Sequence, residues 1–212
     1  MALNNIKGQS YRRWGFKLGA TFFIVLYSVV LAAEMTATTP GYLPQGWTHS
    51  ERQWFHYANQ GSQLIPYPIF LHLEQAGKPE LFRDPEHMQG FAYLRGARNH
   101  FNPDDLPVGF TRDAGYLGLT CAACHTGEVR VNGEQIFIDG GQGNGDLQKL
   151  LRELDRALQA TELDEAKKGR LLARLNSSHG LDQIAAQSLL EEASTKITEL
   201  TSRNNTSLDR GG

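Results

Sequence analysis

The chain has 212 residues, of which 40% are hydrophobic, 9% aromatic and 21% charged. This balance is typical of a globular domain and excludes a disordered, fibrous or polytopic membrane protein. The formal net charge of -2 leaves no basic surplus to neutralise phosphates, which argues against a nucleic-acid partner. The two cysteines are Cys121 and Cys124, so a framework of several disulfides is also excluded.

The N-terminal segment 1–33 has the pattern of an export signal. Four basic residues, the last of them Lys17, precede the uncharged apolar run 18–33. A positive stretch followed by an apolar stretch is typical of a secretory signal peptide. The run is short for a bilayer core, which needs about 20 apolar residues, so we expect a signal peptide, with an uncleaved membrane anchor as the alternative. Both place the rest of the chain in the periplasm or outside the cell, with membrane contact only through an uncleaved segment.

Residues 34–200 are expected to form one domain that begins with short helices. Ser50 is a candidate N-cap for a helix that runs to about Ala58, with Trp54 and Phe55 within it. A second short helix is expected over about 68–75, where aliphatic and aromatic residues cluster.

The segment from Glu128 to Asp139 predicts a β-hairpin. Apolar residues alternate on both sides of Asn132-Gly133, a pair suited to a two-residue turn whose positions both need positive φ. No other segment predicts a strand. The glycines that follow, up to Gly145, are interpreted as a turn, because they lack the Gly-Lys-Ser/Thr ending of a phosphate-binding loop.

Three longer helices are expected after Gly145. From Asp146, leucines recur at the three-and-four spacing of one helix face, and similar patterns start near Asp164 and cover about 181–200. Such apolar stripes are typical of scaffold helices. The last residues, 201–212, have no apolar face and are expected to form a disordered tail.

The sequence Cys121-Ala-Ala-Cys124-His125 is the attachment pattern of c-type haem. Two thiols separated by two residues on a tight turn reach both vinyl groups at one edge of a porphyrin, and the next residue presents its imidazole to the iron. We therefore expect one covalent haem c, with Cys121 and Cys124 as the thioether cysteines and His125 as the axial ligand of the iron. Haem attachment follows export, which agrees with the signal segment.

Three other interpretations of this motif stay open. A thioredoxin-like redox pair uses the same cysteine spacing but needs a strand within a βαβ unit, and residues 115–120 do not predict one. A zinc site needs ligands beyond Cys121 and Cys124. A structural disulfide is compatible with an exported protein but leaves His125 without a role.

Several segments resemble the di-haem cytochrome c peroxidase-like family, and within it most closely the haem-c rubber oxygenases. The resemblance covers roughly 46–160 and lies in QGSQLIPY (60–67), LPVGF (106–110), GLTCAACHTGEV (118–129), IDGG (138–141) and Asp146 with the helix after it. It implies a mainly α, cytochrome c-like haem domain, here with one short β-hairpin after the haem motif. It also implies an extracytoplasmic oxidoreductase in which one haem reacts with peroxide or dioxygen and another relays electrons.

The chain departs from this family because it holds no second Cys-x-x-Cys-His. It therefore resembles an N-terminal haem domain that is truncated or split, with the relay haem beyond Gly212 and no catalytic residue assigned. The expected function is electron transfer through covalent haem, with a second haem domain or an electron-transfer protein as partner.

The alternative function is a mono-haem electron carrier. A sixth iron ligand would favour this carrier, whereas an open iron binds dioxygen or peroxide. The candidates for that ligand are Met88 and His87, although packing roles suit both, and the remaining histidines are interpreted as ordinary surface residues.

Overall fold

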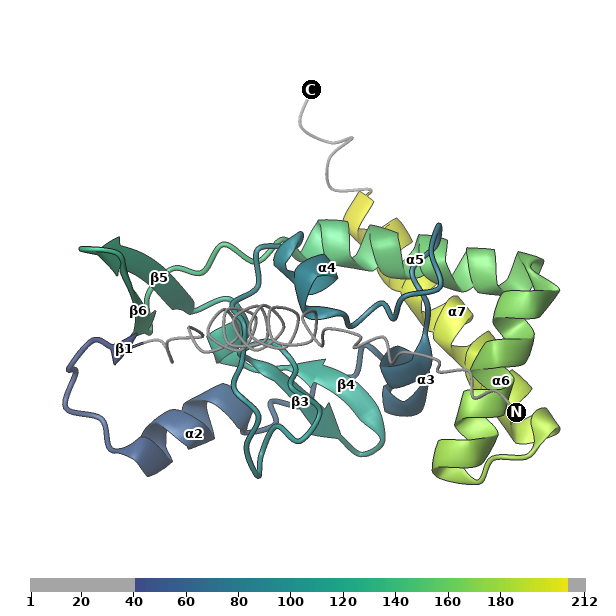
Figure 1. The fold of residues 1–212 in the computed structure, drawn as a ribbon, viewed down its shortest axis with the longest axis horizontal. Helices are drawn as coiled ribbons and strands as arrows, with labels where there is room; N and C mark the ends of the chain where they lie inside the picture. Colours follow the sequence, from purple (N-terminus) through teal and green to yellow (C-terminus); the bar gives the residue numbers. More distant parts are fainter. Residues whose placement is uncertain (1–40, 206–212) are drawn as a thin grey trace, which may run out of the picture. The chain divides into compact units, whose positions relative to one another are not determined.

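The computed structural model describes residues 41–205 (Figure 1). The expected signal, 1–33, and the end of the expected tail, 206–212, lie outside these residues. The elements in chain order are β1 (Gly41–Tyr42), α2 (His49–Tyr57), β2 (Ile65–Pro66), α3 (Tyr67–His72), α4 (Pro85–Gln89), β3 (Phe110–Asp113), β4 (Tyr116–Leu119), the 3₁₀ turn η1 (Cys121–Ala123), β5 (Thr126–Val131), β6 (Glu134–Asp139), α5 (Leu147–Leu163), α6 (Glu165–His179) and α7 (Gln183–Asn205).

The expected hairpin is confirmed as β5 and β6. The two strands pair antiparallel, from Thr126 opposite Asp139 to Val131 opposite Glu134. The turn residue Asn132 and the glycine after it have φ of 53° and 85°, as a two-residue turn of this kind requires. The short strand β1 adds to the other edge of β6 in parallel, which gives a small sheet of order β1-β6-β5.

A second small sheet, of order β2-β4-β3, was not predicted. Its strands β3 and β4 form an antiparallel hairpin around Ala114 and Gly115, which both have positive φ. The described residues therefore mix helices with two small sheets, and the expectation of a mainly α fold with one hairpin is too simple. The strands escaped prediction because they are short and their burial does not alternate along the chain.

The helices agree with the sequence patterns more closely than the strands do. Asp146 caps α5 and Asp164 caps α6 through side-chain hydrogen bonds to backbone amides, as expected for helix starts. For α2 the cap is Thr48, not Ser50, because Thr48 forms a reciprocal capping box with Glu51. Helix α7 continues to Asn205, five residues into the segment expected to be a tail.

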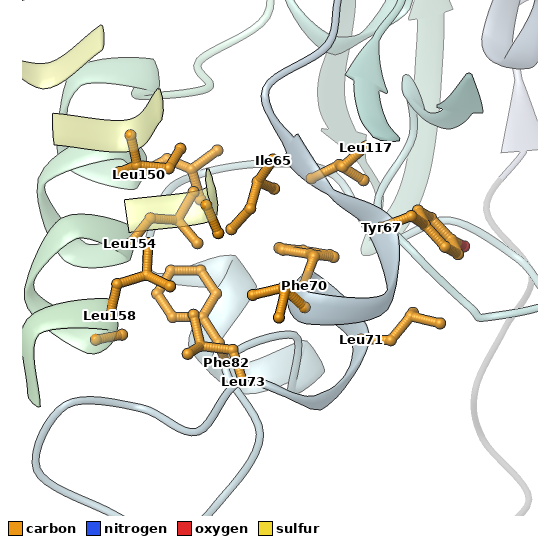
Figure 2. Close-up of a cluster of buried hydrophobic side chains, with 14 of the residues drawn as sticks. Ile65, Tyr67, Phe70, Leu71, Leu73, Phe82, Leu117, Leu150, Leu154 and Leu158 are labelled. Carbon is orange, nitrogen blue, oxygen red and sulfur yellow. The ribbon is translucent and has the colours of Figure 1, made fainter. Parts of the chain in front are cut away.

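The main core lies between α3 and the helices α5, α6 and α7. Leu150, Leu154 and Leu158 share one face of α5 and point toward Ile65 and Phe70 (Figure 2). A second, smaller cluster joins buried Val108, Ala122 and Phe137. Within residues 41–205, no helix is both long and apolar enough to cross a membrane.

Candidate haem-attachment site

The Cys-x-x-Cys-His segment forms one tight turn. The 3₁₀ turn η1 begins at Cys121, and the backbone amide of His125 donates to the carbonyl of Cys121 over 2.8 Å. Cys121, Cys124 and His125 are exposed, whereas Ala122 and Ala123 are buried. The turn therefore exposes the three side chains whose chemistry suits haem attachment. The two alanines between the cysteines pack into the protein interior.

The two alanines anchor the turn in two different clusters. Ala123 belongs to the main core, and Ala122 packs with Val108 and Phe137 in the smaller one. Gly109 approaches so closely that a Cβ atom built on it would lie 2.1 Å from the backbone nitrogen of Ala123. The motif is thus held at its middle by packing that leaves no space for a side chain on Gly109.

Strands lie directly on both sides of the motif. The strand β4 ends at Leu119, so the expectation of no strand before Cys121 is wrong. Its neighbours β2 and β3 are both antiparallel to it, so the βαβ setting of a thioredoxin-like pair is still not formed. Both thiols are free in the structure. Among residues 41–205, no three His, Cys, Asp or Glu side chains lie together as metal ligands.

A buried charged network lies next to the motif. One carboxylate oxygen of Asp139 is 2.6 Å from Nε2 of His56, and the other accepts a hydrogen bond of 2.7 Å from Nε of Arg52. The side chain of Asp139 is 0% exposed and that of His56 is 1% exposed. The Arg52 guanidinium also lies over the ring of Tyr42, 4.1 Å from its centroid. Burial makes this network costly to break, since a remaining charge would lack its partner.

The network contacts both ends of the haem motif. Before the motif, the hydroxyl of Thr120 donates to the backbone carbonyl of His56 over 3.1 Å. After the motif, the hydroxyl of Thr126 lies 3.5 Å from the Asp139 carboxylate. The backbone amide that follows Asp139 donates to the carbonyl of His125 over 2.7 Å. Both ends of the motif therefore contact the segments that carry His56 and Asp139.

Sequence reasoning missed this network. His56 was interpreted as a surface histidine, which is wrong, because it is buried against a carboxylate 83 residues away in the chain. Burial by itself raises the pKa of Asp139, but the hydrogen bonds from His56 and Arg52 outweigh burial and hold the pKa below its usual range. A signal was present in the sequence: in a strand, Phe137 and Asp139 face the same side, so a buried phenylalanine places the acid inward.

A buried tyrosine lies beneath the loop that follows the hairpin. The hydroxyl of Tyr93 is buried without a hydrogen-bond partner, which is rare in proteins. Burial raises its pKa, and the charges of Cys124 and Asp146 raise it further. Its ring lies against the backbone of Gly145, where a Cβ atom would be 2.5 Å from it. An unpartnered donor in the neighbourhood of Cys124 fits a site that holds a polar or charged group when complete.

The residues present fit a haem c. Two exposed thiols and an exposed imidazole are the groups that covalent haem attachment and iron ligation would need, and the Tyr93 hydroxyl is a donor without a partner. Met88 belongs to the buried core and is 2% exposed, so its thioether is packed away from the exposed ligands. His87 is half-buried, with its ring edge-on between Phe82 and Phe91, and its Nε2 has no partner.

The segments that carry the family resemblance meet around the motif. Gly109 of LPVGF packs against Ala123, and the backbone amide of Leu119 donates to the Ser62 hydroxyl of QGSQLIPY over 2.6 Å. Asp139 of IDGG belongs to the buried network. Segments that are separate in the sequence thus lie close together around the Cys-x-x-Cys-His turn.

Comparison with known proteins identifies no family. The uncharacterized protein y4iJ of Sinorhizobium fredii (strain NBRC 101917 / NGR234) is 28% identical over 183 residues. The match takes in 69% of this chain and 30% of the relative, so the chain spans less than a third of that protein's length. No family model matches the chain. No solved structure matches it either.

Proposed function

We propose that this protein binds one haem c covalently and transfers electrons through it. Cys121 and Cys124 form the thioether bonds, and His125 is the axial ligand of the iron. The observation that carries the proposal is the burial pattern of the turn: the two alanines point into packed clusters while both thiols and the imidazole face outward. A disulfide gives no reason for the exposed imidazole beside the second thiol.

A bound haem supplies one-electron chemistry and an iron that can take a small ligand such as dioxygen or peroxide. The chain's own residues hold the attachment segment in place. Ala122 and Ala123 pack its middle into the protein, and the residues His56 and Asp139 contact its ends. The backbone of His125 is held on both sides, because its amide donates to Cys121 and its carbonyl accepts from Gly140, so the residue that would ligate the iron is fixed beside Cys124.

The proposed setting is the periplasm or the extracellular space, reached through the segment 1–33. The proposed partner is a second haem domain or a separate electron-transfer protein. Reaction with peroxide or dioxygen is the family-based extension of this proposal, and no residue is assigned a catalytic role in it.

The covalent bond provides the direct test. The protein, expressed together with a haem-maturation system, should keep a haem stain through denaturing electrophoresis. The double variant Cys121→Ala/Cys124→Ala should lose the stain, whereas His125→Ala should keep it with a changed ferric spectrum. A double variant that retained the stain would overturn the proposal.

The alternative, a mono-haem electron carrier, is tested through the sixth iron ligand. The buried position of Met88 predicts that Met88→Leu, a volume-conserving change, leaves the visible spectrum nearly unchanged. We expect the reduced iron to bind carbon monoxide, because an iron without a strong sixth ligand accepts it. Loss of a thioether-to-iron band in Met88→Leu, or failure to bind carbon monoxide, would favour the carrier.

A further inference from the structure

Two histidines far apart in the sequence meet at the surface. The Nε2 atoms of His72, in the last turn of α3, and His179, in the last turn of α6, are 3.2 Å apart. The centroids of the two rings are 5.2 Å apart, which is about 2 Å more than the distance between the nitrogens. Each Nε2 atom is therefore the part of its ring that is turned toward the other histidine. Both nitrogens therefore face the gap between the rings. Both were expected to be surface residues, and His179 is exposed while His72 is half-buried, but nothing in the sequence indicated that they meet.

This spacing suits two ligands of one metal ion. Zinc binds imidazole nitrogen at about 2.0–2.1 Å, and two such bonds that end 3.2 Å apart enclose an angle of roughly 100°. That angle is close to tetrahedral. A direct hydrogen bond between the rings also fits the distance, but it satisfies one nitrogen as donor and the other as acceptor and leaves no preference for any ion.

A buried carboxylate ties together the segments that carry the two histidines. Glu74, two residues after His72, is 3% exposed and accepts hydrogen bonds from both sides of the Arg170 fork, at 2.8 and 2.6 Å. Arg174, one turn further along α6, lies 3.0 Å from the same carboxylate and donates to the carbonyl of His72. These contacts tie the two helix ends together. A metal would therefore bind to segments that are already ordered, which lowers the entropy cost of binding.

The surroundings of His72 favour the neutral form of its imidazole. Burial lowers the pKa of His72, and His179, Arg83 and Arg174 lower it further, while Asp104 opposes them. A metal ligand must be an unprotonated imidazole. The arginines repel a cation, but His179 lies at the C-terminal end of α6, where the helix dipole favours positive charge.

We propose that His72 and His179 form a binding site for a divalent late first-row metal ion, zinc being the probe, with water completing its coordination. This site is independent of the haem proposal. Imidazole suits zinc, copper and nickel, and copper should bind most tightly of these. The ion would join α3 to α6 and stabilise the folded protein by an amount that grows with the logarithm of its concentration once that exceeds the dissociation constant.

The test is a zinc titration of the full chain by calorimetry, with any free thiols alkylated beforehand. Loss of an outer-shell partner alone typically weakens metal affinity 10–100-fold, so His72→Gln and His179→Gln should each weaken zinc binding at least about tenfold. His49→Gln, at another exposed histidine, is the matched control and should leave the affinity unchanged. His179 is exposed at a helix end, so its substitution leaves the fold intact.

Nitrogen-15 spectra of the imidazoles give a second measurement, in which zinc should shift the Nε2 signals of His72 and His179 together. Unchanged zinc affinity in His179→Gln, or no saturable binding by the unaltered chain, would overturn the proposal and leave a simple hydrogen bond. The haem stain should be the same in all these variants. Failure of the metal site is therefore distinguishable from failure of the haem proposal.

Discussion

Asp139→Asn should destabilise the protein by about 3–5 kcal/mol and reduce haem attachment. Removing one partner of a buried ion pair is strongly destabilising at this scale, because the other charge stays buried without compensation. Here the substitution removes the charge that holds both Arg52 and His56, whose side chains are 14% and 1% exposed. Urea unfolding compares the variant with the unaltered protein, and the haem stain reports attachment.

The matched control is Glu128→Gln, on the neighbouring strand of the same hairpin. Glu128 pairs with Arg130 at 3.0 Å, but the Arg130 side chain is 73% exposed. Surface pairs typically contribute about 0–1 kcal/mol, so this control should lose little stability and no haem. If the two variants unfolded at the same urea concentration, the network around Asp139 would have no positioning role.

The same carboxyl gives a pH dependence whose sign follows from its pKa. The folded-state pKa of Asp139 lies below its unfolded value, near 3.9, because hydrogen bonds from His56 and Arg52 outweigh burial. A depressed carboxyl pKa contributes stability that is fully present above the unfolded value and is lost as pH falls through the folded value. The stability difference between the unaltered protein and Asp139→Asn should therefore hold above about pH 5 and shrink below about pH 4.

Local sequence signals predicted those features that depend on neighbouring residues. Asn132-Gly133 fixed the turn of the β5–β6 hairpin through backbone conformation, and Asp146 and Asp164 marked helix starts through their caps. The Cys-x-x-Cys-His motif was visible because its three candidate residues are close in sequence. Each of these signals acts within a few residues and needs no tertiary contact.

The features that were missed depend on contacts between distant segments. His56 and Asp139 are 83 residues apart, and His72 and His179 are 107 residues apart, so no spacing rule connects them. The hairpin was predicted correctly as an element, but the sequence did not show which of its faces is buried. Its apolar Val129 and Val131 are exposed, at 41% and 50%, whereas the opposite face carries the buried Asp139.

The close approach of Gly109 to the haem motif gives the second large effect. Gly109 has a φ of 81°, and the backbone amide of Thr120 donates to its carbonyl over 2.8 Å. A Cβ atom here would lie 2.1 Å from the backbone nitrogen of Ala123 and 2.5 Å from its Cα. Backbone atoms cannot swing aside as a flexible side chain can, so the motif itself would have to move.

We therefore expect Gly109→Ala to cost about 4 kcal/mol or more and to abolish haem attachment, because it combines backbone strain with overpacking. Gly61→Ala separates the two causes: Gly61 has a φ of 79° and nothing within 4 Å of its Cβ position. That control should lose only the strain of a left-handed residue, about 1–2 kcal/mol, and keep its haem. Thermal unfolding and the haem stain measure both variants. Equal losses would mean that the contact between Gly109 and Ala123 does not hold the turn, and that the alanines alone position Cys121 and His125.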